Sequence, residues 1–233
     1  MKHLNQFITE YIIKKKLDKP INSEHNYKYF PETKRELIDN IKELLDKEKT
    51  DLNCIDTSKI TNMSRLFELY ENINFDISEW DVSNVTNMSH MFYNCKKFDC
   101  DLSNWNVSKV KNMSCMFNRC DLFKGKGLEN WNVSNVKDMS YMFLKCENFN
   151  CDLSKWNVSK VENMSSMFYE CKNFNCDLSK WNVSNVFDIN DMFYDCIKFN
   201  CDLSMWDIGK VYRRFGTFHN CTSLKNKPIW YQE

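Results

Sequence analysis

A segment of about 25 residues recurs along this chain, and this repetition limits the possible folds more than any other feature. Its most regular members are six tryptophans, spaced 25, 26, 25, 25 and 25 residues apart. A fixed period in this range is typical of a solenoid, in which no copy can bury its apolar face without its neighbours. Degenerate copies precede and follow the regular ones. The period predicts about seven coils over residues 51–233, with an insertion near residues 121–130.

Each copy carries two kinds of apolar spacing. Apolar residues from Met88 to Cys95 fall at positions i, i+3, i+4 and i+7, which is the spacing of one face of a helix. Residues 98–102 then alternate apolar and polar side chains, which is the pattern of a half-buried strand. We therefore predict an α/β repeat solenoid in which each 25-residue coil contributes one short parallel β-strand and one short helix.

Stacking such coils at the spacing of parallel strands, roughly 4.8 Å, places equivalent residues in continuous columns. Two of these columns are expected to be structural: Trp80, Trp105, Trp131, Trp156, Trp181 and Trp206 in one, and Cys95, Cys120, Cys146, Cys171, Cys196 and Cys221 in the other. The cysteines stand where the pattern needs a small apolar group. We expect buried free thiols and no metal, and disulfides or a zinc site are the alternatives.

A column of aspartates is also expected, and it is unfavourable by itself because carboxylates about 5 Å apart repel one another. Its members are Asp76, Asp101, Asp152, Asp177 and Asp202. We expect each carboxylate to accept hydrogen bonds from backbone or serine groups at a corner of its coil. The alternatives are a cation site or a strip for a basic partner.

Residues 1–50 lie before the repeat and have helical patterns. Residues 33–36 form a capping-box pattern, which marks a helix start. An amphipathic stripe follows at residues 37–45, and residues 4–13 predict a second, shorter helix. We expect this region to be a helical N-terminal cap that covers the open end of the first coil. The alternative is a separate arm for partner binding or self-association.

Composition narrows the classes of function. The 32 basic residues balance the 32 acidic ones, so the chain lacks the basic excess of a nucleic-acid-binding protein. No run approaches the roughly 18 apolar residues of a membrane helix. The N-terminus has no signal-peptide pattern, because Glu10 interrupts its apolar part. We expect a cytoplasmic protein with no nucleic-acid partner, no membrane insertion and reduced cysteines.

Motifs that would carry catalysis are missing from the sequence. It has four histidines in different contexts, and it contains no Gly-rich phosphate loop, no H-E-x-x-H and no G-x-S-x-G. Its aspartates and glutamates belong to the repeating frame or to faces expected to be exposed. We therefore expect no enzymatic activity and no cofactor.

From residue 85 onward the copies share the pattern V-x-x-M-x-x-M-F-x-x-C-x-x-F-x-x-D-L-S-x-W-x-V-S. This pattern resembles the BspA-like leucine-rich-repeat surface protein family, whose repeats read much like residues 80–98. The resemblance covers residues 51–224. It implies a leucine-rich-repeat-like solenoid with a role in adhesion or protein recognition. Residues 29–45 resemble the leader of intracellular members found in gut bacteria and their phages.

Positions that differ between copies are where a binding surface could be encoded. They are the slot after the N-M-S triplet, the two residues before Cys95 and its equivalents, and the slot before each tryptophan. The candidate partner-binding residues are Tyr93, Tyr141, Tyr169, Tyr194, His90, Arg119 and Asp191. The tyrosines come first, because tyrosine is enriched at interface hot spots. The alternative is that these positions simply tolerate any soluble residue.

These observations together predict a non-enzymatic protein-recognition module that presents a rigid solenoid surface to a protein partner. The alternative is a structural or assembly component, such as part of a phage particle or a self-associating scaffold. In that case the N-terminal helical segment or the last coil would make the contacts. The insertion at residues 121–130 is expected to bulge from one face as a local contact.

Overall fold

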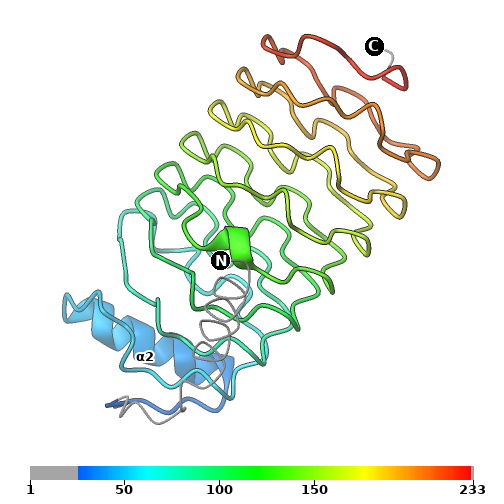
Figure 1. The fold of residues 1–233 in the computed structure, drawn as a ribbon. Coiled ribbons are helices and arrows are strands. Elements are labelled where there is room, and N and C mark those ends of the chain that lie inside the picture. The colour runs from blue at the N-terminus through cyan, green and yellow to red at the C-terminus, as the bar shows by residue number, and fades with distance from the viewer. Residues whose placement is uncertain (1–25, 232–233) are drawn as a thin grey trace, which may run out of the picture.

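The structure is a computed structural model, and it describes residues 26–231. Helix α2 (Lys34–Asp46) lies at one end, and the described residues that follow it form coils that stack along one axis (Figure 1). Hydrogen bonds join each coil to the next, for example from Met88 N–H to the Asn112 carbonyl at 2.9 Å. Single parallel bridges connect successive coils at one corner, from Asn62–Asn87 to Asp188–Arg213.

The interior of the stack consists of aligned apolar columns. The ring of Phe92 stacks on Phe98 at 4.2 Å between centroids, and on Phe117 of the next coil at 5.3 Å. Trp105 and Trp131 lie 6.3 Å apart with their planes within 1° of parallel. The six tryptophans and six cysteines expected to be structural are all buried in these columns. Equivalent side chains therefore cover one another from coil to coil.

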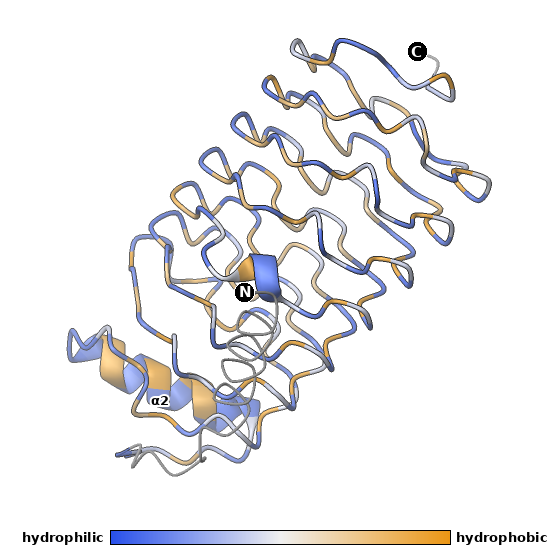
Figure 2. Ribbon diagram, in the orientation of Figure 1, coloured by the Kyte–Doolittle hydropathy of each residue, from blue (hydrophilic) through white to orange (hydrophobic). Residues whose placement is uncertain are grey.

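Helix α2 closes the N-terminal end of the stack. The Thr33 hydroxyl accepts the N–H of Glu36 at 3.2 Å and so caps the helix start. Apolar and polar residues alternate along the helix (Figure 2), and its buried residues are Leu37, Ile41 and Leu44. The helix expected at residues 4–13 lies outside the described residues, and the domain boundary near residue 50 stays a prediction.

The prediction of one strand and one helix per coil is wrong. Among residues 26–231, the helices are α2 and the three-residue 3-10 helix η1 (Leu128–Asn130), and the β-structure is limited to isolated bridges. Most of these bridges, from Asn62–Asn87 to Asp188–Arg213, lie directly before the segments where helices were expected. The chain is therefore not the α/β, leucine-rich-repeat-like solenoid predicted from the spacing and the resemblance. Its coils are built almost wholly from turns.

The helix-like spacing does not produce a helix, because two residues in most copies have a left-handed backbone conformation. His90 has a φ of +58° and Asn94 a φ of +61°. An α-helix needs consecutive right-handed residues, so two left-handed residues four apart interrupt it. Equivalent positive φ values occur at Arg65, Cys115, Tyr141, Ser166, Asp191 and Gly216, and at Arg119, Lys145, Glu170, Asp195 and Asn220.

The segment with alternating apolar and polar residues, residues 98–102, does not form a strand for a different reason. Burial does alternate, since Phe98, Cys100 and Leu102 are buried. Leu102 donates its N–H to the next coil at 3.1 Å, but Asp101 turns the chain at once by accepting the N–H of Ser103 at 3.0 Å. The extended stretch is too short for a ladder of hydrogen bonds.

Every second peptide group in the segments with left-handed residues is aligned with the stack axis. The N–H groups of Met88, His90, Phe92 and Asn94 donate to the next coil at 2.7 to 2.9 Å. The carbonyls that immediately precede the first three of these groups accept N–H groups from the coil before. In these segments, N–H groups therefore point toward the C-terminal end and carbonyls toward the N-terminal end.

The insertion does not stand clear of the stack as expected. Gly127 has a φ of +94°, and a Cβ atom there would lie 2.3 Å from the backbone nitrogen of Ser103 in the preceding coil. Only glycine fits this close approach. Helix η1 follows at once, and Leu128 is fully buried. The extra residue is thus absorbed by a tight turn.

Candidate functional site

The tryptophan and cysteine columns supply hydrogen bonds as well as bulk. Trp105 donates its Nε1–H to the carbonyl of Ile77 at 3.0 Å, and Cys120 donates its Sγ–H to the carbonyl of Phe92 at 3.0 Å. Each of these carbonyls also accepts a backbone N–H of its own coil. Sequence reasoning treated the cysteines as small apolar groups and missed this role as donors between coils.

Burial makes these thiols very weak acids. Desolvation raises the pKa of Cys95 to about 12 and the pKa of Cys100 to about 11. The thiolate is the nucleophilic and metal-binding form of cysteine. All twelve cysteines are free thiols in the structure, and those in the columns hold the coils together as neutral groups.

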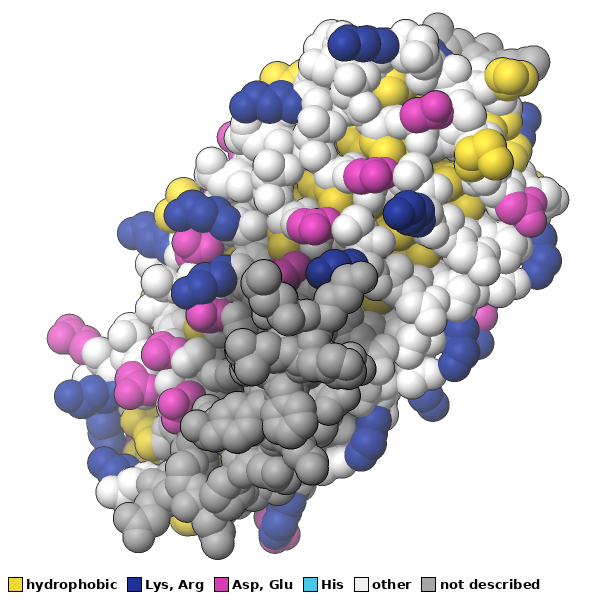
Figure 3. Space-filling view, viewed as in Figure 1, with side chains coloured by type: hydrophobic (Ala, Val, Ile, Leu, Met, Phe, Trp, Pro, Cys, Tyr) yellow, Lys and Arg dark blue, Asp and Glu magenta, His cyan; other side chains and the backbone are white. Residues whose placement is uncertain are grey.

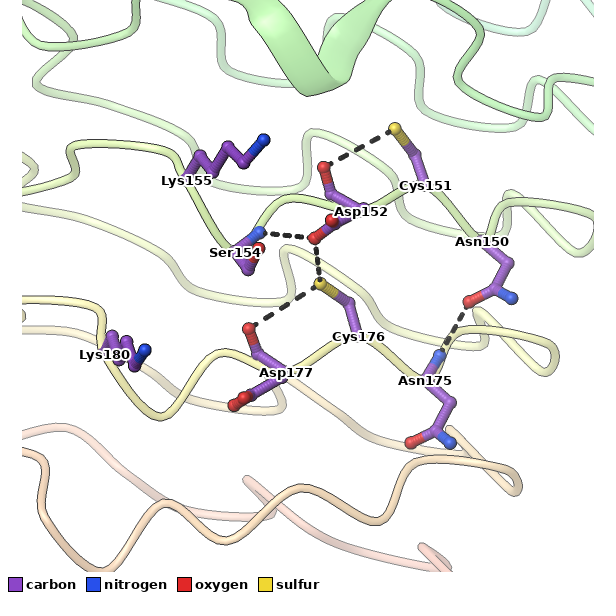
Figure 4. Close-up of a pocket in the computed structure, with 9 residues that line it drawn as sticks. All are labelled: Asn150, Cys151, Asp152, Ser154, Lys155, Asn175, Cys176, Asp177 and Lys180. Atoms are coloured by element: carbon purple, nitrogen blue, oxygen red, sulfur yellow. Dashed lines mark hydrogen bonds between the residues drawn. The ribbon is translucent and has the colours of Figure 1, made fainter. Parts of the chain in front are cut away.

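The aspartate column lies beside a groove of about 610 Å³ between two coils (Figure 4). Asp152 accepts the N–H of Ser154 at 2.9 Å, and the thiol of Cys176 donates to its Oδ1 at 3.6 Å. Hydrogen bonds from the serine lower the pKa of Asp152. This is the arrangement expected for the column. In residues 26–231, no group of three His, Cys, Asp or Glu side chains is placed to hold a metal ion.

Lysine and asparagine alternate strictly in another column. Its members are Lys59, Asn84, Lys109, Asn135, Lys160, Asn185 and Lys210. Lys160 donates to the Asn135 side-chain oxygen at 2.8 Å, and Asn135 donates in turn to the carbonyl of Ser108 at 2.8 Å. Because an asparagine separates each pair of lysines, neighbouring ammonium groups stand two coils apart, roughly 10 Å.

Among the candidate partner-binding residues, two tyrosines lie together. The rings of Tyr169 and Tyr194 stack at 4.6 Å, and His219 stacks on Tyr194 at 4.5 Å. We call these three residues the aromatic strip. Sequence reasoning missed His219 as a member, although it follows Tyr194 by one period in the degenerate last copy.

Carboxylates flank the aromatic strip. The carboxylate of Asp191 lies against Gly216 of the last coil. A Cβ atom added at Gly216 would lie 2.1 Å from Oδ1 of Asp191. Desolvation raises the pKa of Asp191. Asp195 accepts a hydrogen bond from the side chain of Asn220 at 2.6 Å, and Glu170 pairs with Lys145 at 3.1 Å. The strip is therefore an aromatic surface with an acidic border.

The other candidates lie apart from the strip. Tyr93 occupies the same column, but Asn118 and Leu144 stand between it and Tyr169. The ring of His90 contacts that of Tyr93 at 5.8 Å. Tyr141 and Arg119 are exposed in neighbouring columns. The four tyrosines do not form one cluster.

A family model described as "Mycoplasma protein of unknown function, DUF285" matches residues 35–128 and 116–230. No curated protein and no solved structure matches the chain. The predicted resemblance is confirmed as far as the repeat family. Assignment to a surface protein, a gut bacterium or a phage stays a prediction. Within residues 26–231, no helix has the length and apolar character needed to cross a membrane.

Proposed function

The chain belongs to the DUF285 family of repeat proteins, and from this premise we propose that it is a non-enzymatic recognition module whose aromatic strip binds a protein partner. The observation that carries the proposal is the stack of Tyr169, Tyr194 and His219. None of the three is needed for the buried frame, since Asn118 and Leu144 fill the same column elsewhere.

A prestacked aromatic surface suits recognition. Rings that already lie parallel lose little conformational entropy on binding, so more of the contact energy appears as affinity. The acidic border from Glu170, Asp191 and Asp195 favours a cationic residue of the partner. An arginine fits best, because its planar guanidinium group can stack on a ring and pair with a carboxylate together.

The test compares two tyrosines of one column. A fluorescein-labelled peptide that alternates Arg and Ser is titrated with the wild-type chain, with Tyr194→Ala and with Tyr93→Ala, and its anisotropy is followed. We expect Tyr194→Ala to weaken binding about tenfold, as at an interface hot spot. The Tyr93→Ala control should stay within about twofold of wild type, because Tyr93 lies outside the strip.

Equal weakening by both substitutions would contradict the proposal, and so would equal binding of a peptide that alternates Glu and Ser. The assembly alternative predicts a different result. In that case the wild-type chain would elute from a sizing column as an oligomer, and no Arg–Ser binding would be seen.

A further inference from the structure

The outer edge of the last coil is a second surface, which adjoins the aromatic strip at His219. In the coil before it, N–H groups donate to the carbonyls of Arg213, Phe215, Thr217 and His219 at 2.8 to 2.9 Å. The equivalent N–H groups of the last coil belong to Arg214, Gly216, Phe218 and Asn220, and no backbone acceptor faces them within residues 26–231.

One of these four groups is covered. The Tyr231 ring packs edge-on against Phe218 at 5.0 Å, and Phe218 is buried. Arg214 and Gly216 are half-buried and Asn220 is exposed. The edge therefore presents a row of hydrogen-bond donors without matching carbonyls, which is a template for pairing with another chain.

The last two coils also expose large apolar side chains. Phe215 is 85% exposed, Met205 86%, Tyr212 74% and Ile229 93%. Hydrophobic side chains gather over the last coils on the face drawn in Figure 3. Phe215 occupies a position that serine or asparagine fills in every earlier coil. Large exposed apolar groups in one place mark interaction surfaces.

The charge of the last coil differs from that of its neighbour. Residues 207–231 hold five lysines and arginines and one aspartate, which gives a net charge of +4. Residues 182–206 hold one lysine and four aspartates, which gives −3. The coil that presents the free donors is therefore the most basic coil of the stack, and the coil next to it is acidic.

A second copy of the chain does not fit this edge. The same edge of another copy would bring N–H groups against N–H groups and basic residues against basic residues. The opposite end of another copy has carbonyls, but α2 covers that end and the Lys34 ammonium group already donates to the Ser64 carbonyl. The occupant must bring carbonyl acceptors and negative charge from elsewhere.

We propose that the outer edge of the last coil docks an extended acidic segment of another polypeptide. The segment's carbonyls accept the N–H groups of Arg214, Gly216 and Asn220, as in the addition of a strand to a sheet edge. Its carboxylates face the basic residues of the last coil, and its apolar side chains cover Phe215.

The experiment uses the whole chain and a fluorescein-labelled ten-residue peptide that alternates Glu and Val. Binding is followed by anisotropy for the wild type and for Phe215→Ser, Arg214→Glu and Arg119→Glu. Phe215→Ser restores the residue type of the inner coils, so the fold is kept. Arg119→Glu is the matched control, because Arg119 is an exposed arginine away from the edge.

We expect each of the two edge variants to weaken binding about tenfold and the control to stay within about twofold. Bound peptide should also slow hydrogen exchange at Gly216 and Asn220. Equal binding of a Lys–Val peptide would overturn the proposal, as would full competition by oligo-dT at equal charge or unchanged binding by both edge variants. Tyr194→Ala, which disrupts the strip, should leave this binding intact, so the two proposals fail separately.

Discussion

The two ends of the stack have opposite hydrogen-bonding chemistry. At the N-terminal end, α2 covers the first coil and Lys34 donates to the Ser64 carbonyl. At the C-terminal end, the last coil presents N–H groups beside Phe215, which is largely exposed. Because peptide groups are aligned along the axis, a stack of nearly identical coils has unlike ends. A lysine can satisfy the carbonyl end, whereas only an acceptor can satisfy the donor end.

The largest expected effect is unfolding at alkaline pH, and it tests whether helix α2 can stay folded after the coils unfold. Burial raises the pKa of Cys95 to about 12 from an unfolded value near 9. The folded state therefore keeps protons that the unfolded state loses, and stability falls as pH rises from 9 toward 12. Each such thiol costs roughly 1.4 kcal/mol per pH unit in that window.

With thiol columns along the stack, we expect unfolding near pH 10. The measurement is circular dichroism at 222 nm, for α2, alongside tryptophan fluorescence, for the coils. The two signals should change together, because a 13-residue helix is marginal in isolation. A helix signal that outlasts the fluorescence change would show that the cap folds independently of the coils.

Next in size is a pair of substitutions at the two ends. Leu37→Ala removes a fully buried side chain of α2 and should lower the free energy of unfolding by about 3 kcal/mol. Phe215→Ser should change it by less than about 0.5 kcal/mol, because Phe215 is largely exposed. Urea unfolding followed by tryptophan fluorescence measures both. Equal losses would mean that the C-terminal end is as well covered as the N-terminal end.

A third pair compares an inner coil with the last one. Trp156 is buried and donates to the Leu128 carbonyl at 2.8 Å, while Trp230 is half-buried and donates to Leu203 at 3.1 Å. Replacing each by phenylalanine removes the indole donor. We expect a loss of about 1.5 kcal/mol for Trp156→Phe and less than about 1 kcal/mol for Trp230→Phe, again by urea unfolding. A larger loss at Trp230 would contradict an open C-terminal end.

The smallest effect concerns single donors at each end. Lys34→Gln shortens the side chain that donates to Ser64 and should cost about 1 kcal/mol. Arg214→Gln, at the donor end, should have no measurable effect on stability, because residues 26–231 offer its backbone N–H no backbone acceptor. Thermal unfolding at matched salt compares them. A destabilised Arg214→Gln variant would show that this side chain takes part in the fold.

Several parts of this fold follow from the sequence alone. The period places the tryptophans and cysteines in columns, and the capping box and apolar stripe place a helix at residues 34–46. The local structure of a coil does not follow, because turns with two left-handed residues four positions apart bury residues at the same spacing as a helix. Left-handed residues are hard to detect here, since most are not glycine.

The candidate surface was predicted less well than the frame. Tyr169 and Tyr194 are neighbours in one column, and their rings stack. His219, which stacks on Tyr194, was not predicted because it lies in the degenerate last copy. Trp230 was missed for a similar reason. It stacks on Trp206 at 6.4 Å, but it follows that residue by 24 positions instead of 25. A period search that tolerates a shift of one residue would find Trp230, and a search with the exact period that includes the degenerate last copy would find His219.

The alternation of lysine and asparagine sets a limit on how such a chain can change its length. Deleting one coil would place Lys109 directly beneath Lys160, with two ammonium groups about 5 Å apart and no amide between them. Deleting two coils would keep lysine against asparagine throughout. Although the repeat has 25 residues, the unit that can be gained or lost without an electrostatic conflict is the pair, about 50 residues.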